Sequence, residues 1–264
     1  MSAKVALKQN HIQQHLAVKR ADLKVCNLKK SFSGKEILRD VSFKICSEEA
    51  VSLIGANGSG KSTLIRCCLR LIEPDGGRLE FFGQDLMLAN QRGLRKIRSK
   101  VGFVSQKHNL VPRLSVLSNV LHGALAYQRS PRLWFQGFAP SVLREKAMHC
   151  LELVGLQDFG SRRADHLSGG QSQRVAIARA LMQQPEFIIA DEPVASLDPQ
   201  AGDEVMELFV SLVRKEKITL LFSSHNLDHA IKYSDRILGL RNGEIEIDTA
   251  SSGQSAFTLR GFYE

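Results

Sequence analysis

The sequence lacks any apolar run close to the roughly 18 to 20 residues that a membrane-spanning helix requires. Residues 1–22 are polar and contain no apolar stretch typical of a signal peptide. No CxxC pair or His/Cys spacing indicates a disulfide framework or a zinc site. The cysteines, for which we expect buried and reduced thiols, are Cys26, Cys46, Cys67, Cys68 and Cys150. These absences lead us to expect a protein that stays in the cytoplasm.

An internal repeat, a low-complexity tract and a coiled coil are also absent from the sequence. Aromatic residues make up 6% of the chain and form no cluster suited to stacking on nucleic-acid bases. The net charge of +9 is compatible with nucleic acid, with an anionic membrane face, or with an anionic nucleotide and a solvated surface. Charge alone does not choose among these partners.

The chain does have the composition of an ordinary globular protein, with 264 residues of which 43% are hydrophobic and 24% charged. This size suits one large domain, or one domain with a subdomain. Residues 23–45 predict short strands with a turn at Ser33-Gly34, and hence a small β-rich layer. Residues 51–54 predict an apolar strand, which a glycine-rich turn connects to a helix over residues 61–72.

Further buried strands are predicted in the second half of the chain. Residues 187–191 form a nearly continuous apolar run, as expected for a parallel strand covered on both faces. The pattern recurs at residues 218–223 and 236–240, and Asn242-Gly243 indicates a hairpin turn. Alternating strands and helices with right-handed crossovers predict an α/β fold with a mainly parallel sheet. Between its strands we expect a mainly helical insertion at about residues 84–184.

A phosphate-binding motif, G-x-x-x-x-G-K-[ST], occupies residues 55–62, after the predicted strand and at the start of the predicted helix. In this context backbone N–H groups and the helix N-terminus bind phosphate, and glycines let the backbone approach without a Cβ atom. We expect Lys61 to reach the β- and γ-phosphate oxygens and the Ser62 hydroxyl to ligate Mg²⁺. The alternative is a glycine-rich turn without a ligand.

Asp191 and Glu192 stand at the end of the predicted strand over residues 187–191. Carboxylates at the carboxyl end of a core strand face the nucleotide crevice, so Asp191 would hold Mg²⁺ and Glu192 would polarise the attacking water. Taken alone, Asp-Glu-Pro could equally mark the start of a helix, where acidic residues are favoured. The phosphate-binding motif in the same chain favours the catalytic interpretation.

The segment Leu-Ser-Gly-Gly-Gln at residues 167–171 precedes a predicted helix over residues 173–182. Taken alone, it reads as a helix N-cap at Ser168 with glycines in the turn. Together with the phosphate-binding motif, however, it matches the signature of the ATP-binding cassette (ABC) ATPase family, which the chain resembles from about residue 23 to residue 248.

Other elements of that family follow in the expected order. Gln106 is similar to the Q-loop glutamine, residues 196–198 are similar to the D-loop, and His225 is similar to the switch histidine. Phe32 stands where the family usually has an aromatic residue that stacks on adenine, although a phenylalanine between strands is more often part of the core.

The resemblance implies a P-loop NTPase core of the α/β class, with a mainly parallel sheet, a small antiparallel β subdomain and an inserted helical subdomain. Residues 1–21 would be a polar N-terminal extension, residues 22–248 the ATPase domain, and residues 249–264 a C-terminal tail. Within the ATPase domain, the helical subdomain would span about residues 84–184.

A head-to-tail homodimer is also implied, in which each ATP lies between the phosphate loop of one subunit and the signature of the other. The residues implied in catalysis are Glu192, His225, Lys61 and Gln106, and those implied in Mg²⁺ binding are Ser62, Gln106 and Asp191. The residues implied in ATP binding are Phe32, Gly55, Asn57, Gly58, Ser59, Gly60, Lys61, Ser62, Thr63, Ser168, Gly169, Gly170, Gln171 and Asp198. Because each ATP site would need residues from both subunits, a lone monomer would be a poor ATPase.

Residues 106–125, the insert around Trp134 and the order of residues 192–199 resemble the phosphonate-import ATPase subfamily. The alternative for residues 129–138 is a solvated loop with a buried Trp134. The resemblance implies a peripheral subunit at the cytoplasmic face of the inner membrane, which docks through residues 110–125 on transmembrane permease subunits. A solute-binding protein would act indirectly. A cassette does not touch the cargo. The alternatives to phosphonate as the transported solute are therefore phosphite, phosphate and an unrelated solute.

Two other functions compete with this one. A nucleic-acid-associated ABC ATPase would explain the charge of +9, but the missing aromatic platform and coiled coil lead us to expect no nucleic-acid partner. An ATP-dependent kinase on the same phosphate loop would leave the signature and His225 unexplained.

Overall fold

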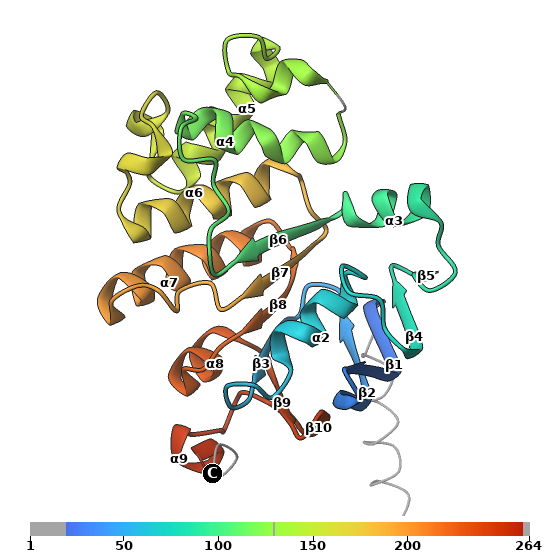
Figure 1. The fold of residues 1–264 in the computed structure, drawn as a ribbon. Coiled ribbons are helices and arrows are strands. Elements are labelled where there is room, and N and C mark those ends of the chain that lie inside the picture. Colours follow the sequence, from blue (N-terminus) through green and yellow to red (C-terminus); the bar gives the residue numbers. More distant parts are fainter. Residues whose placement is uncertain (1–19, 129, 261–264) are drawn as a thin grey trace, which may run out of the picture.

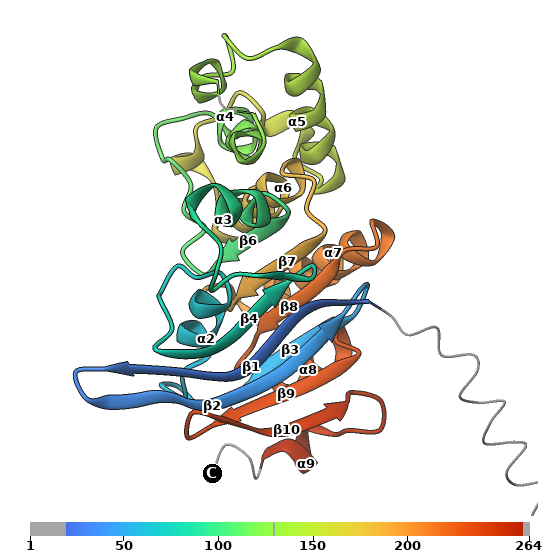
Figure 2. The same ribbon diagram turned by 90° about the vertical axis from the view of Figure 1, so that its right-hand side faces the viewer.

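The computed structural model describes residues 20–128 and 130–260, which form two sheets and a set of helices (Figure 1). The sheets lie in the lower part of the view, and several helices form a separate upper part (Figure 2). Within the described residues, no helix combines the length and the apolar character needed to cross a bilayer.

The smaller sheet is antiparallel and lies at the start of the chain. Its strands in spatial order are β2 (Lys35–Cys46), β1 (Ala21–Phe32), β4 (Gly76–Phe81) and β5 (Gln84–Asp85). The strands predicted within residues 23–45 therefore form one long hairpin. The chain reverses at Ser33 and Gly34, which have φ of 48° and 81°. Positive φ at both central residues suits a tight hairpin turn.

The larger sheet carries five parallel strands and one antiparallel edge strand. Its strands in spatial order are β10 (Glu244–Ala250), β9 (Arg236–Arg241), β3 (Ala50–Ile54), β8 (Thr219–Ser223), β7 (Phe187–Asp191) and β6 (Val101–Ser105). Every residue of β3, β7 and β8 is buried, which confirms that these strands are covered on both faces. The hairpin predicted at Asn242-Gly243 is also confirmed, since it joins β9 to β10.

Helix α2 (Lys61–Cys68) is shorter than the helix predicted over residues 61–72. The chain leaves the helix because Arg70 takes a φ of 49°, and the N–H groups of Leu71 and Ile72 donate to the carbonyl of Arg66. Leu71, which the helix predicted over residues 61–72 would include, is 54% exposed. Sequence periodicity overestimated this helix because the apolar pattern continues into the turn that follows it.

The upper part of the molecule contains α4 (Val116–Leu121), α5 (Ser141–Leu153) and α6 (Gly169–Met182). The boundaries expected for the helical insertion, residues 84–184, are too wide, because they enclose a strand of the larger sheet. Its first part forms α3 (Gln91–Arg98), and β6 is an edge strand of the larger sheet that pairs in parallel with β7. A five-residue apolar run such as β6 has no periodicity of its own that separates strand from helix. The parallel pairing with β7 makes this segment a strand.

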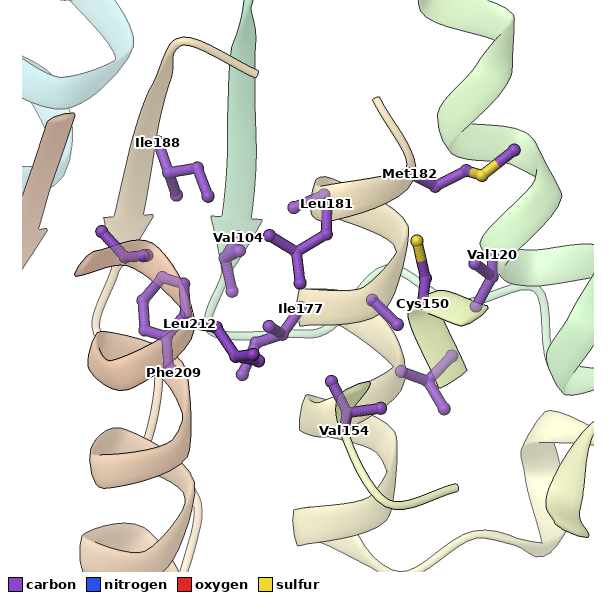
Figure 3. Packing of buried hydrophobic residues seen from close by; sticks show 14 of the residues in the cluster. Val104, Val120, Cys150, Val154, Ile177, Leu181, Met182, Ile188, Phe209 and Leu212 are labelled. Atoms are coloured by element: carbon purple, nitrogen blue, oxygen red, sulfur yellow. The ribbon is translucent and has the colours of Figure 1, made fainter. Parts of the chain in front are cut away.

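One apolar core joins this helical part to the larger sheet (Figure 3). Strands β6 and β7 supply Val104 and Ile188, α6 supplies Ile177 and Leu181, and Phe209 comes from α7 (Pro199–Lys215). Shared burial makes α6 a rigid support between the sheet and the outer helices.

The ends of the chain differ in how far they are described. Residues 1–19 of the expected N-terminal extension and residues 261–264 lie outside the described residues. In the expected tail, β10 continues to Ala250 and is followed by α9 (Ala256–Arg260). Leu259 of α9 is buried against Ile54 and Ile237, so this part of the tail packs on the core.

Candidate functional site

The loop between β3 and α2 holds the predicted phosphate-binding residues. Gly55, Gly58 and Gly60 have φ of 153°, 81° and 105°, which residues with a side chain rarely adopt. A Cβ atom at Gly55 would lie 2.4 Å from the carbonyl oxygen of Leu240, so glycine is required there. The Ser59 hydroxyl is buried without a hydrogen-bond partner in the described residues. A buried unpaired hydroxyl and a backbone with three glycines suit a loop that binds an anion.

Lys61, the first residue of α2, points its ammonium group back across this loop. Its Nζ donates to the carbonyl oxygens of Gly55 at 2.8 Å and Ala56 at 3.2 Å, and lies 4.0 Å from Oε1 of Glu192. Burial lowers the pKa of Lys61, and the carboxylates of Glu192 and Asp191 oppose that shift. The loop thus holds a buried cation whose hydrogen-bond partners are two backbone carbonyls and whose nearby carboxylate is Glu192. Such a cation is suited to an anionic ligand.

Asp191 ends β7 and accepts hydrogen bonds from two hydroxyl groups. Ser62 Oγ of α2 and Ser223 Oγ of β8 both donate to Asp191 Oδ1, at 3.2 Å and 2.8 Å. The Asp191 side chain is buried, yet it stands next to the phosphate-binding loop. Hydroxyl and carboxylate oxygens at this position are the donors that Mg²⁺ prefers.

Glu192 follows directly and takes a left-handed backbone conformation with a φ of 48°. Its N–H donates to Ser223 Oγ at 2.9 Å, and its Oε2 lies 3.9 Å from Nδ1 of His225. Glu192 and His225 line a cavity of about 190 Å³ together with Leu197 and Asp198. The structure therefore brings the predicted catalytic pair and the predicted D-loop to one place.

Gln106 directly follows β6, at the same carboxyl end of the parallel strands as Asp191 and Glu192. Ser105, the residue before it, pairs in register with Asp191, so β6 and β7 end side by side. The Gln106 side chain is exposed at this edge.

Phe32 lies at the end of β1 with 45% of its surface exposed, so it is not a core residue. The ammonium group of Lys30 lies 5.2 Å from the centre of its ring. Asp75 accepts hydrogen bonds from Lys30 Nζ and from the Ser31 N–H, both at 2.6 Å. These contacts hold the end of β1, where the Phe32 ring is partly exposed.

The predicted signature forms the start of α6. Ser168 is the N-cap, its Oγ accepts from the Gln171 N–H at 3.3 Å, and Gln171 Oε1 accepts from the Ser168 N–H at 3.0 Å. This capping box confirms the N-cap reading of the sequence. Helix α6 belongs to the upper part of the molecule in Figure 1, whereas the loop between β3 and α2 lies in the lower part.

Within one chain, the signature lies beside the D-loop region. A Cβ atom at Gly169 would lie 3.0 Å from Cδ2 of Leu197. Asp198 is the N-cap of α7, and its Oδ1 accepts from the Ala201 N–H at 3.0 Å. The exposed Ser168 and Gly169 thus present a helix N-terminus to the outside of the chain.

Two residues with contacts in this region were not predicted from the sequence. Ser223 bonds both Asp191 and Glu192, and Arg179 of α6 donates to the carbonyl groups of His108 and Asn109, just beyond Gln106. A hydroxyl at the carboxyl end of the mostly apolar run over residues 218–223, which also contains Thr219, was the available signal for Ser223. For Arg179 the local sequence offers none, since its partners are distant in the chain.

A phosphate-binding loop between strand and helix, with two carboxylates at the end of a parallel strand that is separated from it by one other strand, defines a P-loop nucleotide-binding protein of the α/β class. The family described as ABC transporter matches residues 38–195. The chain belongs to this family and is an ABC ATPase cassette.

Curated relatives are similar over most of the chain. The phosphonates import ATP-binding protein PhnC of Nitratidesulfovibrio vulgaris is 43% identical over 91% of both chains. The protein of the same name from Wolinella succinogenes is 44% identical over 91% of this chain and 88% of its own.

Solved structures agree in fold. The dimeric bacterial ABC transporter cassette MJ0796 has a TM-score of 0.77 and 33% identity, and the match covers 88% of this chain and all of that one. A second dimeric structure of MJ0796, in a post-hydrolysis state with ADP and Pi, has a TM-score of 0.74 and 32% identity over the same 88% of this chain. The expected fold class and family are therefore confirmed.

Proposed function

We propose that this cassette hydrolyses ATP to drive phosphonate import, as a homodimer docked on membrane permease subunits at the cytoplasmic face of the inner membrane. The observation that carries the proposal is the gathering of Lys61, Asp191, Glu192 and His225 around one loop. The names of the relatives support phosphonate as the cargo, because they are similar along nearly the whole chain.

ATP would bind with its phosphates in the loop of residues 55–63 and its adenine against Phe32. The N–H groups at Asn57, Gly58, Ser59 and Gly60, together with the start of α2, supply partial positive charge for the β-phosphate. Lys61 would exchange its present carbonyl partners for phosphate oxygens, which are stronger acceptors for an ammonium group. Thr63 follows in the first turn of the same helix.

Ser62, Asp191 and Gln106 fit a Mg²⁺ site by their oxygen donors, and the ion would neutralise phosphate charge when bound. Glu192 would orient and polarise the attacking water, and His225 would contact the γ-phosphate. The positions of these two side chains, 3.9 Å apart, allow both to reach one reacting group.

A second copy of the chain would complete the site. Helix α6, which begins at Gly169, belongs to the upper part of the molecule, whereas the loop between β3 and α2 lies in the lower part, and this separation supports a role of Ser168, Gly169, Gly170 and Gln171 at the loop of a partner. Asp198, at the exposed start of α7, would lie in the same interface. A capped helix start with glycine N–H groups suits the γ-phosphate.

The permease would dock on the upper part, at residues 110–125 and the adjacent insert. Trp134, Phe135 and Phe138 are 59%, 52% and 72% exposed, so the alternative of a buried Trp134 is wrong. Gln136 anchors this insert on α4, because its N–H donates to Ser118 Oγ at 3.2 Å. Exposed aromatic residues on a rigid support are typical of an interaction surface.

Growth of a deletion strain tests the cargo. Loss of growth on a phosphonate as phosphorus source, with normal growth on phosphate, is expected, and the wild-type gene should restore it while a Glu192→Gln gene should not. Unchanged growth of the deletion strain on phosphonate would contradict phosphonate import. Loss of growth on phosphite or phosphate instead would assign another oxyanion.

A further inference from the structure

Ser223 is the last residue of β8 and is fully buried between β3 and β7. The four residues before it are Thr219, Leu220, Leu221 and Phe222, so this hydroxyl ends a mostly apolar strand. A buried hydroxyl is retained in such a place only when its hydrogen bonds are satisfied. Those of Ser223 reach the two carboxylate residues of the site.

The Ser223 hydroxyl bonds two adjacent residues in opposite senses. It donates to Asp191 Oδ1 at 2.8 Å and accepts from the Glu192 N–H at 2.9 Å. One contact fixes the side chain of the proposed metal ligand, and the other fixes the backbone of the proposed base. A single atom thus sets the relative placement of both residues.

The backbone contact matters because Glu192 has a φ of 48°. A residue with a Cβ atom takes this conformation only when its surroundings impose it. This backbone conformation directs the Glu192 carboxylate toward Lys61 and His225. Its Oε1 lies 4.0 Å from Lys61 Nζ, and its Oε2 lies 3.9 Å from His225 Nδ1. Without the bond to Ser223, the Glu192 backbone could relax and redirect that carboxylate.

The side-chain contact restricts Asp191 in a similar way. Ser62 Oγ and Ser223 Oγ approach the same oxygen, Oδ1, from different elements. Ser62 would itself bind the metal ion, so Ser223 is the partner of Oδ1 that stays in place when the site is loaded.

We infer that Ser223 is a positioning residue for hydrolysis, which holds Asp191 and Glu192 in one working arrangement through its hydroxyl group. Its hydroxyl is fully buried and acts through its hydrogen bonds to Asp191 and Glu192. The inference rests on the proposed roles of Asp191 and Glu192 in ATP hydrolysis, and is independent of the cargo.

The test compares full-length Ser223→Ala with Ser223→Thr, which keeps the hydroxyl. Residues that support metal ligands affect activity or metal affinity by about 10- to 100-fold. Ser223→Ala should therefore lower kcat at least about tenfold and raise the Mg²⁺ concentration needed for half activity, with KM for ATP changing less than about threefold. Ser223→Thr should recover most of the lost kcat.

A matched control is Ser52→Ala, which removes a buried hydroxyl from the neighbouring strand β3. Ser52 Oγ accepts from Ser234 Oγ at 3.1 Å and bonds neither carboxylate. This variant should keep the kcat of the wild type. An equal fall in both alanine variants would overturn the inference, since it would show a general effect of a lost core hydroxyl.

Amide hydrogen exchange gives a readout that does not depend on activity. In metal-free and nucleotide-free protein, the Glu192 N–H should exchange faster in Ser223→Ala than in the wild type, and at the wild-type rate in Ser223→Thr. If Ser223→Ala proves insoluble, Ser223→Cys replaces it, because a thiol keeps the volume with a weak donor. Wild-type kcat in a folded Ala or Cys variant would overturn the inference.

Different results would refute the proposed function and the positioning role of Ser223. A wild-type chain with no ATPase activity in any condition would refute the proposed hydrolysis itself. A wild-type chain that hydrolyses ATP, beside a Ser223→Ala variant of equal activity and equal Glu192 exchange, would refute the positioning role alone.

Discussion

Arg179 Nη1 donates to the carbonyl oxygen of Asn109 at 2.6 Å, which ties α6 to the loop that follows β6. Its Nη2 donates to the carbonyl of His108 at 2.6 Å. His108 and Asn109 both have positive φ, at 56° and 51°, so the loop depends on outside support. The helix that starts at Ser168 and the loop that starts at Gln106 are thereby joined through one side chain.

Arg179→Ala should separate these two elements. Two carbonyl groups would lose a charged donor, and because water can reach the exposed Asn109, the loss in free energy of unfolding should be about 1 to 3 kcal/mol in total. Urea unfolding checks the stability, and ATPase activity with and without permease checks the coupling, which should fall more than basal hydrolysis. Arg174→Ala on the same helix, which loses an ion pair with Glu204 at 3.7 Å, is the control. Equal coupling in both variants would contradict the expectation.

Glu192→Gln should bind ATP and hydrolyse it at least about 100-fold more slowly, because removal of a general base typically costs 10² to 10⁴ in rate. Unhydrolysed ATP should then hold two chains together. Size-exclusion chromatography with light scattering should show a dimer with ATP and a monomer with ADP. Glu186→Gln, an exposed change at the start of β7, should behave like the wild type. Hydrolysis at the wild-type rate in Glu192→Gln would rule out the proposed base.

Mixed dimers test the shared site. Lys61→Ala breaks the phosphate-binding loop, and Ser168→Arg blocks the signature, so each homodimer should be inactive. In a head-to-tail dimer of one copy of each, one of the two sites has an intact loop and an intact signature. ATPase activity should reappear on mixing, toward half of the wild-type activity per heterodimer. If mixing restored nothing while heterodimers formed, the signature would not act in trans.

Lys61→Met should stabilise the protein without nucleotide while abolishing ATP binding. Burial lowers the pKa of Lys61 below its ordinary value of 10.5, so the folded state disfavours the charged form. This penalty is fully present below the folded pKa and disappears as the pH rises through the folded pKa toward the unfolded value. Calorimetry should therefore show a higher Tm for the variant at pH 7 and a smaller gap at higher pH. A lower Tm for the variant at pH 7 would contradict this account, and ATP should raise only the wild-type Tm.

Features carried by neighbouring residues were determined by the sequence itself. The phosphate-binding loop needs only closely spaced glycines, a lysine and a hydroxyl, and residues 55–60 form the expected turn between β3 and α2. The apolar runs at residues 187–191 and 218–223 specify buried parallel strands because both of their faces must be covered. The N-cap at Ser168 is equally local, since it bonds within one helical turn.

Other features were decided only by the tertiary structure. The apolar run of β6 became a strand through its pairing with β7, and α2 stopped at Cys68 where Arg70 turned the chain. Ser223 and Asp191 are 32 residues apart, and Arg179 and Asn109 are 70 apart. Their hydrogen bonds exist because the folded sheet and helix α6 bring distant backbone together, and no local pattern encodes that distance.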